Sequence, residues 1–491
     1  MTRFERLALV GIVALAAALR FATLGLQSLD FDEAYTVQIV GGSLGHVFAQ
    51  VPVTESTPPL FYLLQWAWAQ MFGVGAVGLR TLSALLGTLV VPVAFAAGRR
   101  LSGVRAGLLA ALLVAVNPLM VWYSQEARSY ALLSLLCALS FWAFLGALER
   151  PSVAVLAGWA LASAAALATH YFAVFLVGVE AGWLLWLLWR RPDARRWVVP
   201  AVGAVAIVGL ALLPLAADQA SHNRTEWIEA LSLPARVREV GKKWLTGEIG
   251  PVASWELGLF VVVVGVLLAL ERGGRRRGAL VAAAVGGGAL AVSLIVDLAG
   301  AHYLISKNEM PALTVLLVAL GVGLAGGRAG SAGAAVAALF FLGLTVAVAF
   351  VPSMQRPDIR DAAAAIGARA RDQVVVTPRL GDAPLAVYRR GAAPVGPGWP
   401  GGVVLLALPL PRADTGGPRP GTPAAPPGFR LAGREDARRW SLVCFLPSRG
   451  RPVRSGFAQL AALGGGVGAS ALTWPGARLA SAPLPRACGR R

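Results

Sequence analysis

Long apolar runs are the feature of this sequence that most constrains its fold. A helix needs about 20 apolar residues to cross the hydrocarbon core of a bilayer. Of the 491 residues, 57% are hydrophobic and 14% charged, whereas soluble domains have about 45–50% and about 25%. The chain is therefore predicted to be a polytopic α-helical membrane protein, whose first apolar run remains in the membrane as an anchor. We predict eleven spans, at about 6–25, 79–98, 106–123, 130–148, 152–170, 172–189, 197–216, 257–270, 279–300, 310–327 and 331–351.

Basic residues indicate which ends of these spans face the cytoplasm. The net charge of +19 comes largely from short arginine clusters between apolar runs, such as Arg99-Arg100 and Arg275–Arg277. Cytoplasmic loops carry such an excess of lysine and arginine, so the N-terminus is predicted to be cytoplasmic. Because eleven is odd, the C-terminal region is then extracytoplasmic, and the protein is a multi-pass protein of the plasma membrane. Contact of these arginines with anionic headgroups accounts for the charge, so no nucleic-acid partner is predicted.

One apolar run is too short to cross. Residues 58–73 are rich in tryptophan and begin with Pro58-Pro59. A segment of this kind suits a helix that lies in the membrane interface with its aromatic rings at headgroup depth. Residues 26–78 are therefore predicted to form one extracytoplasmic loop with surface helices.

The character of the sequence changes after residue 351. A helix is predicted from about residue 356 to 371, and short β-like runs follow at 374–376, 403–406 and 442–445, with a Pro- and Gly-rich loop at 411–428. We therefore divide the chain into a transmembrane module, 1–351, and a small extracytoplasmic α/β domain, 352–491. Cys444 and Cys488 are candidates for a disulfide bond there, since exported regions meet oxidising conditions.

Acidic residues gather where apolar runs end on the outer side. Asp30, Asp32 and Glu33 follow the first span, and Glu126 follows the third. An ionised carboxylate is costly within the bilayer, so acids at this depth either reach the membrane surface or serve a function. Asp30 is predicted to be a loop acid or helix cap. Candidate cations on the same face are Arg128, Arg224, Lys242, Lys243 and Lys307.

Several of these residues also have purely structural interpretations. Acids are favoured at any helix N-terminus, which would account for Asp32 and Glu33. Glu126 and Arg128 could form an interfacial ion pair. His170 next to Tyr171 could be an interfacial anchor.

Short motifs resemble those of GT-C glycosyltransferases, in particular the protein O-mannosyltransferase family (family 39) and the aminoarabinose-transferase-like family. They occur in the expected order over residues 1–180, and more loosely at 303–308 and 355–358. The matching segments are Phe31-Asp32-Glu33-Ala34-Tyr35, Thr57-Pro58-Pro59-Leu60, Leu79-Arg80-Thr81, Tyr123-Ser124-Gln125-Glu126-Ala127-Arg128 and Thr169-His170-Tyr171. Relatives often carry His or a cation at the position of Thr57.

This resemblance implies transfer of a sugar from a polyprenyl-phosphate carrier to a protein, lipid or polysaccharide acceptor, with inversion at the anomeric carbon. Asp32 would be the general base or would position the acceptor, Glu33 would support it, and Glu126 would be a second active-site acid. Residues implied in binding the donor and its phosphate are Arg128, Lys307, Tyr35, Pro58, Pro59, Tyr62, His170, Tyr171 and Arg224. The participation of a divalent metal stays open.

A membrane transporter or lipid flippase is the alternative function. It would need acids near the middle of spans and symmetry between two halves of the chain. Here the acids lie at span ends on one side and no internal repeat is evident, which favours an enzyme.

Overall fold

The computed structural model describes the chain except residues 189–190, 223–225, 251, 253, 270–275, 367–372, 378–380, 390–392, 395–402, 409–423, 426, 438, 449–469 and 474–491. It divides into two compact units. The helical unit comprises Met1–Leu24 and Ile39–Ala347. The sheet unit comprises Gly25–Gln38 and Val348–Arg491, so the acidic part of the first loop belongs with the C-terminal region.

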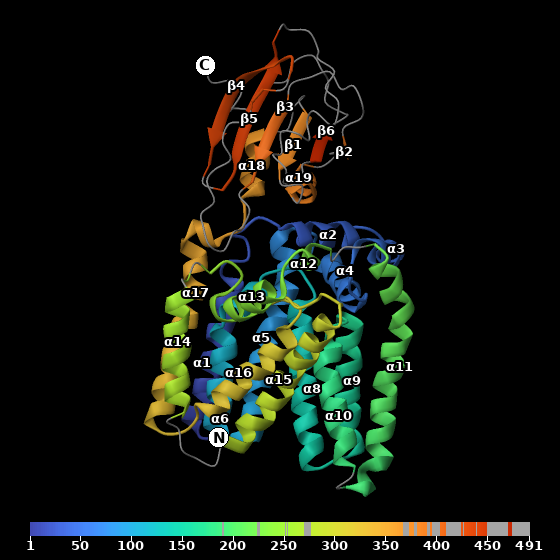
Figure 1. The fold of residues 1–491 in the computed structure, drawn as a ribbon, viewed down its shortest axis with the longest axis vertical. Coiled ribbons are helices and arrows are strands. Elements are labelled where there is room, and N and C mark those ends of the chain that lie inside the picture. The colour runs from blue at the N-terminus through green and yellow to red at the C-terminus, as the bar shows by residue number, and fades with distance from the viewer. Residues whose placement is uncertain are drawn as a thin grey trace. The chain divides into compact units, whose positions relative to one another are not determined.

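The helical unit consists of helices of very different length (Figure 1). Five described helices are long and apolar enough to cross a membrane, and a bent pair would make six. The eleven predicted spans stay a prediction. The helices are α1 (Arg3–Phe21), α3 (Leu44–Thr54), α4 (Leu60–Phe72), α5 (Ala76–Ser102), α6 (Val104–Val116), α7 (Pro118–Ser124), α8 (Tyr130–Glu149), α9 (Val153–Thr169), α10 (Ala173–Leu187), α11 (Arg195–Ala220), α12 (Glu226–Glu229), α13 (Leu233–Thr246), α14 (Ser254–Ala269), α15 (Arg276–Leu298), α16 (Met310–Gly323) and α17 (Arg328–Phe350).

Two apolar segments of the helical unit are not straight, full-length spans. Helix α4 has 13 residues, and at 1.5 Å per residue it is about 20 Å long, less than the roughly 30 Å of bilayer hydrocarbon. The predicted span 106–123 is not straight: α6 and α7 meet at an angle of 61°. The break falls at Asn117-Pro118, because proline disfavours a helical conformation in the residue before it and has no N–H to donate.

Small residues allow the central helices to approach closely. A Cβ atom on Gly98 of α5 would lie 3.0 Å from the carbonyl of Ala106 and from Cα of Gly107 in α6. Gly103 connects these helices with φ of 86°, a value that residues with a side chain rarely adopt. Such contacts replace the hydrophobic effect as the force between helices in lipid.

The described part of the sheet unit contains six strands in the order β2-β6-β1-β3-β5-β4 (Figure 1). Only β1 and β3 among these pairs run parallel, and the others are antiparallel. The strands are β1 (Gln373–Thr377), β2 (Ala393–Pro394), β3 (Val403–Ala407), β4 (Phe429–Asp436), β5 (Ser441–Pro447) and β6 (Ser470–Thr473). The three predicted β-like runs coincide with β1, β3 and β5.

Two described helices pack on this sheet, α18 (Ile359–Ile366) and α19 (Asp382–Tyr388), and the unit also contains Phe31–Gln38 of α2 (Phe31–Val40). Ile359 and Ile366 of α18 and Leu385 of α19 pack against Val374, Leu406 and Leu442 in one hydrophobic core. The predicted helix from about residue 356 is thus present as α18, which begins after Pro357. The domain boundary predicted at residue 352 stays a prediction.

Candidate active site

Asp30, Asp32 and Glu33, here called the acidic loop, lie at the start of helix α2. The Asp30 carboxylate accepts the backbone N–H of Phe31 at 2.8 Å, and the Glu33 carboxylate accepts the backbone N–H of Asp30 at 3.0 Å. A glutamate that bonds back to the residue three positions earlier is one half of a capping box, and acids in the first turn are stabilised by the partial positive charge of the helix N-terminus. Asp30 therefore occupies the position just before the helix, and Asp32 lies in the first turn of the helix.

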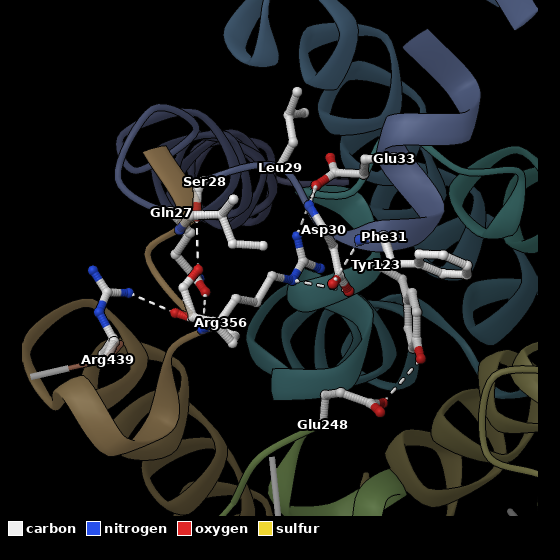
Figure 2. A network of polar contacts seen from close by, with 12 residues as sticks. Gln27, Ser28, Leu29, Asp30, Phe31, Glu33, Tyr123, Glu248, Arg356 and Arg439 are labelled. Carbon is white, nitrogen blue, oxygen red and sulfur yellow. Dashed lines mark hydrogen bonds and ion pairs between the residues drawn. The ribbon is translucent and has the colours of Figure 1, made fainter. Parts of the chain in front are cut away.

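Arg356 pairs with two acids of this loop, Glu33 and Asp30. Its Nη1 atom donates to Glu33 Oε2 at 3.0 Å, and its Nε atom lies 3.7 Å from Asp30 Oδ2. The Glu33 side chain is fully buried and that of Arg356 is 6% exposed. Glu33 is thus part of a buried ion pair (Figure 2).

The second acidic turn follows the break between α6 and α7. Asn117 caps α7 by accepting the N–H groups of Leu119 and Met120, each at 3.1 Å. The last carbonyls of α6 are satisfied by Arg20 of α1, which donates to Ala115 O at 2.9 Å and to Val114 O at 3.3 Å. Arg20 also donates to Ser124 Oγ at 3.1 Å. A cation is favourable at a helix C-terminus, so the bend that presents residues 125–129 is stabilised by both caps.

Arg128 in this turn pairs with an acid that the sequence analysis did not single out. Its two terminal nitrogens donate to the two carboxylate oxygens of Glu55 at 2.9 and 2.8 Å. The guanidinium carbon lies 5.8 Å from the ring centre of Tyr62. Burial raises the pKa of the Tyr62 hydroxyl well above its usual value, which keeps it protonated. Glu126 is 3% exposed.

A signal for Glu55 is present in the sequence. It is the only aspartate or glutamate between Glu33 and Glu126. A single acid within 92 positions, in a loop just before Pro58, would have justified including it among the candidates.

Lys307 lies among aromatic rings of the helical unit. Its Nζ atom is 5.8 Å from the ring centre of Tyr130 and 6.0 Å from that of Trp227. The Tyr130 ring in turn lies 5.7 Å from His170. These are distances at which a cation is attracted by the faces of aromatic rings.

The loop that carries Lys307 is held by two acids. Glu239 of α13 accepts both the N–H and the hydroxyl of Ser306, each at 3.3 Å. Asp297 at the end of α15 forms a buried ion pair with Arg236 of α13, with an N–O distance of 2.8 Å. Helix α13 therefore fixes the conformation of the loop.

The candidate cation Lys243 is neutralised by carboxylates. Its ammonium lies 2.7 Å from Glu239 and 2.6 Å from Glu248. Burial lowers the pKa of Lys243, but the two carboxylates outweigh it and raise the pKa above its usual value. Glu248 also accepts the hydroxyl of Tyr123 at 2.9 Å (Figure 2).

The predicted site residues are distributed over both units. The helical unit brings Arg128, Tyr62, His170 and Lys307 into one region around Tyr130. Tyr171 donates to Gln219 at 2.8 Å, and Gln219 bonds to the carbonyl of Thr57 at the start of the Pro58-Pro59 segment. Asp32, Glu33 and Tyr35 belong to the sheet unit. The meeting of acids from the two outer turns stays a prediction, and Arg224 lies outside the described residues.

No group of three or more His, Cys, Asp or Glu side chains that could hold a metal ion occurs among the described residues. Cys444 is disulfide-bonded, whereas Cys137 is free and buried. Cys488 lies outside the described residues, so its pairing with Cys444 stays a prediction.

Comparison with known proteins finds one matching family model and similar solved structures. Residues 56–216 match the family model described as dolichyl-phosphate-mannose-protein mannosyltransferase. The crystal structure of ArnT from Cupriavidus metallidurans in the apo state is 16% identical, with a TM-score of 0.57 over 89% of this chain and 97% of ArnT. ArnT bound to undecaprenyl phosphate, also 16% identical over the same shares of the two chains, has a TM-score of 0.55. No curated protein matches the sequence significantly.

These matches also bear on the membrane assignment. The described part of the chain has several helices long and apolar enough to cross a bilayer, and the chain shares its fold with ArnT. The predicted class, a multi-pass α-helical membrane protein, is therefore confirmed. Residues 56–216 therefore match a family model of the kind that the sequence motifs resemble, and the fold is shared with ArnT over most of the chain.

Proposed function

We propose that this protein transfers a sugar from a polyprenyl-phosphate donor to an acceptor at the extracytoplasmic face of the plasma membrane. The acceptor is a protein, a lipid or a polysaccharide. The observation that carries this proposal is the fold shared with ArnT, including its complex with undecaprenyl phosphate. The cations of the outer turns and the acidic loop at the start of α2 supply the chemistry that such a transfer needs.

In the proposed reaction, an acceptor hydroxyl attacks the anomeric carbon of the sugar and the bond from that carbon to the phosphate oxygen breaks. The configuration at the anomeric carbon inverts, because the displacement is direct. The acceptor proton passes to a carboxylate, and the polyprenyl phosphate leaves with the negative charge. Positioned acids and cations accelerate such steps by removing the proton and by stabilising the charge that develops.

We assign the base to Asp32. Asp32 stands next to Glu33 in the segment Phe31–Tyr35, which resembles the first-loop motif of the GT-C families. Glu126 is the second acid, and Arg128, Lys307 and Arg224 are the cations for the lipid phosphate. The other proposed donor contacts are Tyr35, Pro58, Pro59, Tyr62, His170 and Tyr171.

The proposed topology has eleven spans, a cytoplasmic N-terminus and an extracytoplasmic region from residue 352. Both acidic turns then face the same compartment as the sugar.

The proposal is tested by Asp32→Asn in proteoliposomes supplied with a panel of undecaprenyl-phosphate sugars and an envelope extract as the source of acceptor. Release of undecaprenyl phosphate is measured. Removal of a general base should reduce kcat roughly 100- to 10,000-fold. Asp30→Asn is the matched control, because asparagine is as good a helix cap as aspartate, and its rate should stay near that of the parent.

Two outcomes would contradict the proposal. Full activity of Asp32→Asn would exclude Asp32 as the base. Movement of a fluorescent polyprenyl-phosphate sugar across the membrane by the parent, without release of the sugar, would identify a flippase instead of a transferase.

A further inference from the structure

The segment that follows the last long helix makes a dense set of contacts with the acidic loop. Both belong to the sheet unit, although they are separated by more than 300 positions in the chain. Figure 2 shows the Gln27 side chain directed toward the backbone of Arg356, whose own side chain extends toward Asp30 and Glu33. Nothing in the proposed reaction uses this segment, so its contacts require a separate explanation.

Backbone contacts fix the two segments in register. The Gln27 side chain accepts the backbone N–H of Arg356 at 2.9 Å. The buried Ser28 hydroxyl donates to the carbonyl of Pro357 at 2.7 Å and accepts the N–H of Ile359 at 3.1 Å. Residues 27–28 are thus bonded to the turn that starts α18.

Charged contacts act on the start of α2 itself. Arg356 donates to Glu33, whose carboxylate also accepts the backbone N–H of Asp30. Arg356 is in turn anchored from the strand side, because its carbonyl accepts Arg439 Nη1 at 2.8 Å, and Arg439 pairs with Asp358 at 2.9 Å. Removal of one partner from a buried ion pair leaves an uncompensated charge, which is strongly unfavourable.

A third contact comes from helix α19. The hydroxyl of Tyr388 accepts the backbone N–H of Leu29 at 2.8 Å. Leu29 is 2% exposed, so this N–H would otherwise lie buried without an acceptor. Tyr388 packs against the core that contains Leu385, Val374 and Leu406, which connects the loop to the centre of the sheet.

We propose that Arg356 and Tyr388 are positioning residues for the acidic loop. The inference rests on the proposed function, because it assigns a role to these residues through Asp32. An α-helix turns by about 100° per residue, so a small shift in where α2 begins redirects the Asp32 carboxylate. Displacement of a reacting group by about 1 Å can reduce a rate roughly 100-fold.

The first arm of the test measures transfer by Arg356→Ala, Arg356→Lys and Tyr388→Phe under the conditions described above. We expect Arg356→Ala to lower kcat roughly 100-fold with the KM for donor changed by less than about twofold, as expected when substrate binding is intact. Lysine keeps the charge but donates from a single nitrogen, so Arg356→Lys should recover part of the rate that Arg356→Ala loses. Tyr388→Phe keeps the ring and should lower kcat roughly tenfold.

The second arm needs no substrate. Hydrogen–deuterium exchange is measured for peptides that cover residues 25–38. Faster exchange is expected in Arg356→Ala and in Tyr388→Phe. Trp440→Phe is the matched control, because it removes a partly buried hydrogen bond to Asp361, which lies in the same unit and does not involve residues 25–38. Arg434→Ala is a second control, since its guanidinium pairs with Asp436 two residues along β4.

The two arms separate the possible failures. Unchanged exchange in residues 25–38 of both test variants would overturn the positioning role. Equal loss of kcat in Trp440→Phe and Tyr388→Phe would also overturn it, because general destabilisation of the unit would then suffice. If the parent released no undecaprenyl phosphate, the proposed function would fail, while the exchange data would still decide whether Arg356 and Tyr388 hold the loop.

Discussion

At the scale of single residues, the Glu55–Arg128 pair shows why a buried charge needs its partner. Both side chains are nearly inaccessible, at 3% and 9% exposure, and the two terminal guanidinium nitrogens both donate to the carboxylate. A two-point contact of this kind fixes the plane of the guanidinium as well as its position. Arg128 is therefore held rigidly beside the ring of Tyr62.

This geometry predicts strong coupling between the two residues. Glu55→Gln should lower the free energy of unfolding by about 3–5 kcal/mol, because it leaves the Arg128 charge uncompensated. The double variant Glu55→Gln/Arg128→Met should lose clearly less than the sum of the two single variants. Unfolding in mixed detergent micelles measures these values.

A control is available in the same protein. Glu149 pairs with Arg100 but is 53% exposed, and Glu149→Gln should change stability by less than about 1 kcal/mol. If the losses at Glu55 and Arg128 were simply additive, the two side chains would not act as a pair.

At the scale of elements, the break between α6 and α7 determines where the second acidic turn lies. Asn117 and Arg20 satisfy the backbone groups that the break exposes, and α5 packs directly behind it. Gly87 of α5 leaves the space that Ser124 and Arg20 occupy, since a Cβ atom there would overlap Ser124 Oγ and lie 3.3 Å from Arg20 Nε. The bend therefore depends on the absence of one side chain in a neighbouring helix.

This arrangement predicts that Gly87→Ala displaces α7. We expect a lower apparent melting temperature in detergent and a reduced rate of undecaprenyl phosphate release, because Glu126 and Arg128 move with the turn. Gly178→Ala in α10 is the control: nothing lies within 4 Å of its Cβ position, and alanine favours a helix by up to about 1 kcal/mol relative to glycine. A melting temperature of Gly87→Ala equal to that of the control would contradict the argument.

The elements also show what the sequence could predict. The runs at 374–376, 403–406 and 442–445 are buried and rich in β-branched or large apolar residues, and each became a strand. Strand β4 was missed because its residues, Phe429–Asp436, are largely charged or small and partly exposed. Glu55 was not chosen as a candidate because its partner lies 73 positions away, a contact that no local pattern contains.

At the scale of the whole molecule, the proposed orientation can be tested with α5. This helix has 27 residues and ends at Gly75 on one side and Gly103 on the other. A cysteine at Ala76 should react with an impermeant maleimide added to intact cells, and one at Ser102 should react only after the membrane is opened. The parent protein is the control for reaction of its own cysteines. Reaction of both positions from the same side would show that α5 does not cross and would remove the argument that α4 lies on the surface.

The division of the chain is where the sequence was least informative. Composition changes near residue 352 and suggests a boundary there, yet residues 25–38 belong to the sheet unit. Local composition could not reveal this, because the association depends on hydrogen bonds such as Ser28 to Pro357, between residues 329 positions apart.

The distance in sequence between the acidic loop and Arg356 has a consequence for how the protein is made. Synthesis proceeds from the N-terminus, so the loop enters the membrane while the residues that will hold it have not yet been translated. Hundreds of further residues must be inserted before Arg356 and Tyr388 emerge. On the proposed positioning role, the nascent chain therefore lacks the contacts that hold its acidic loop until more than 300 further residues have been added.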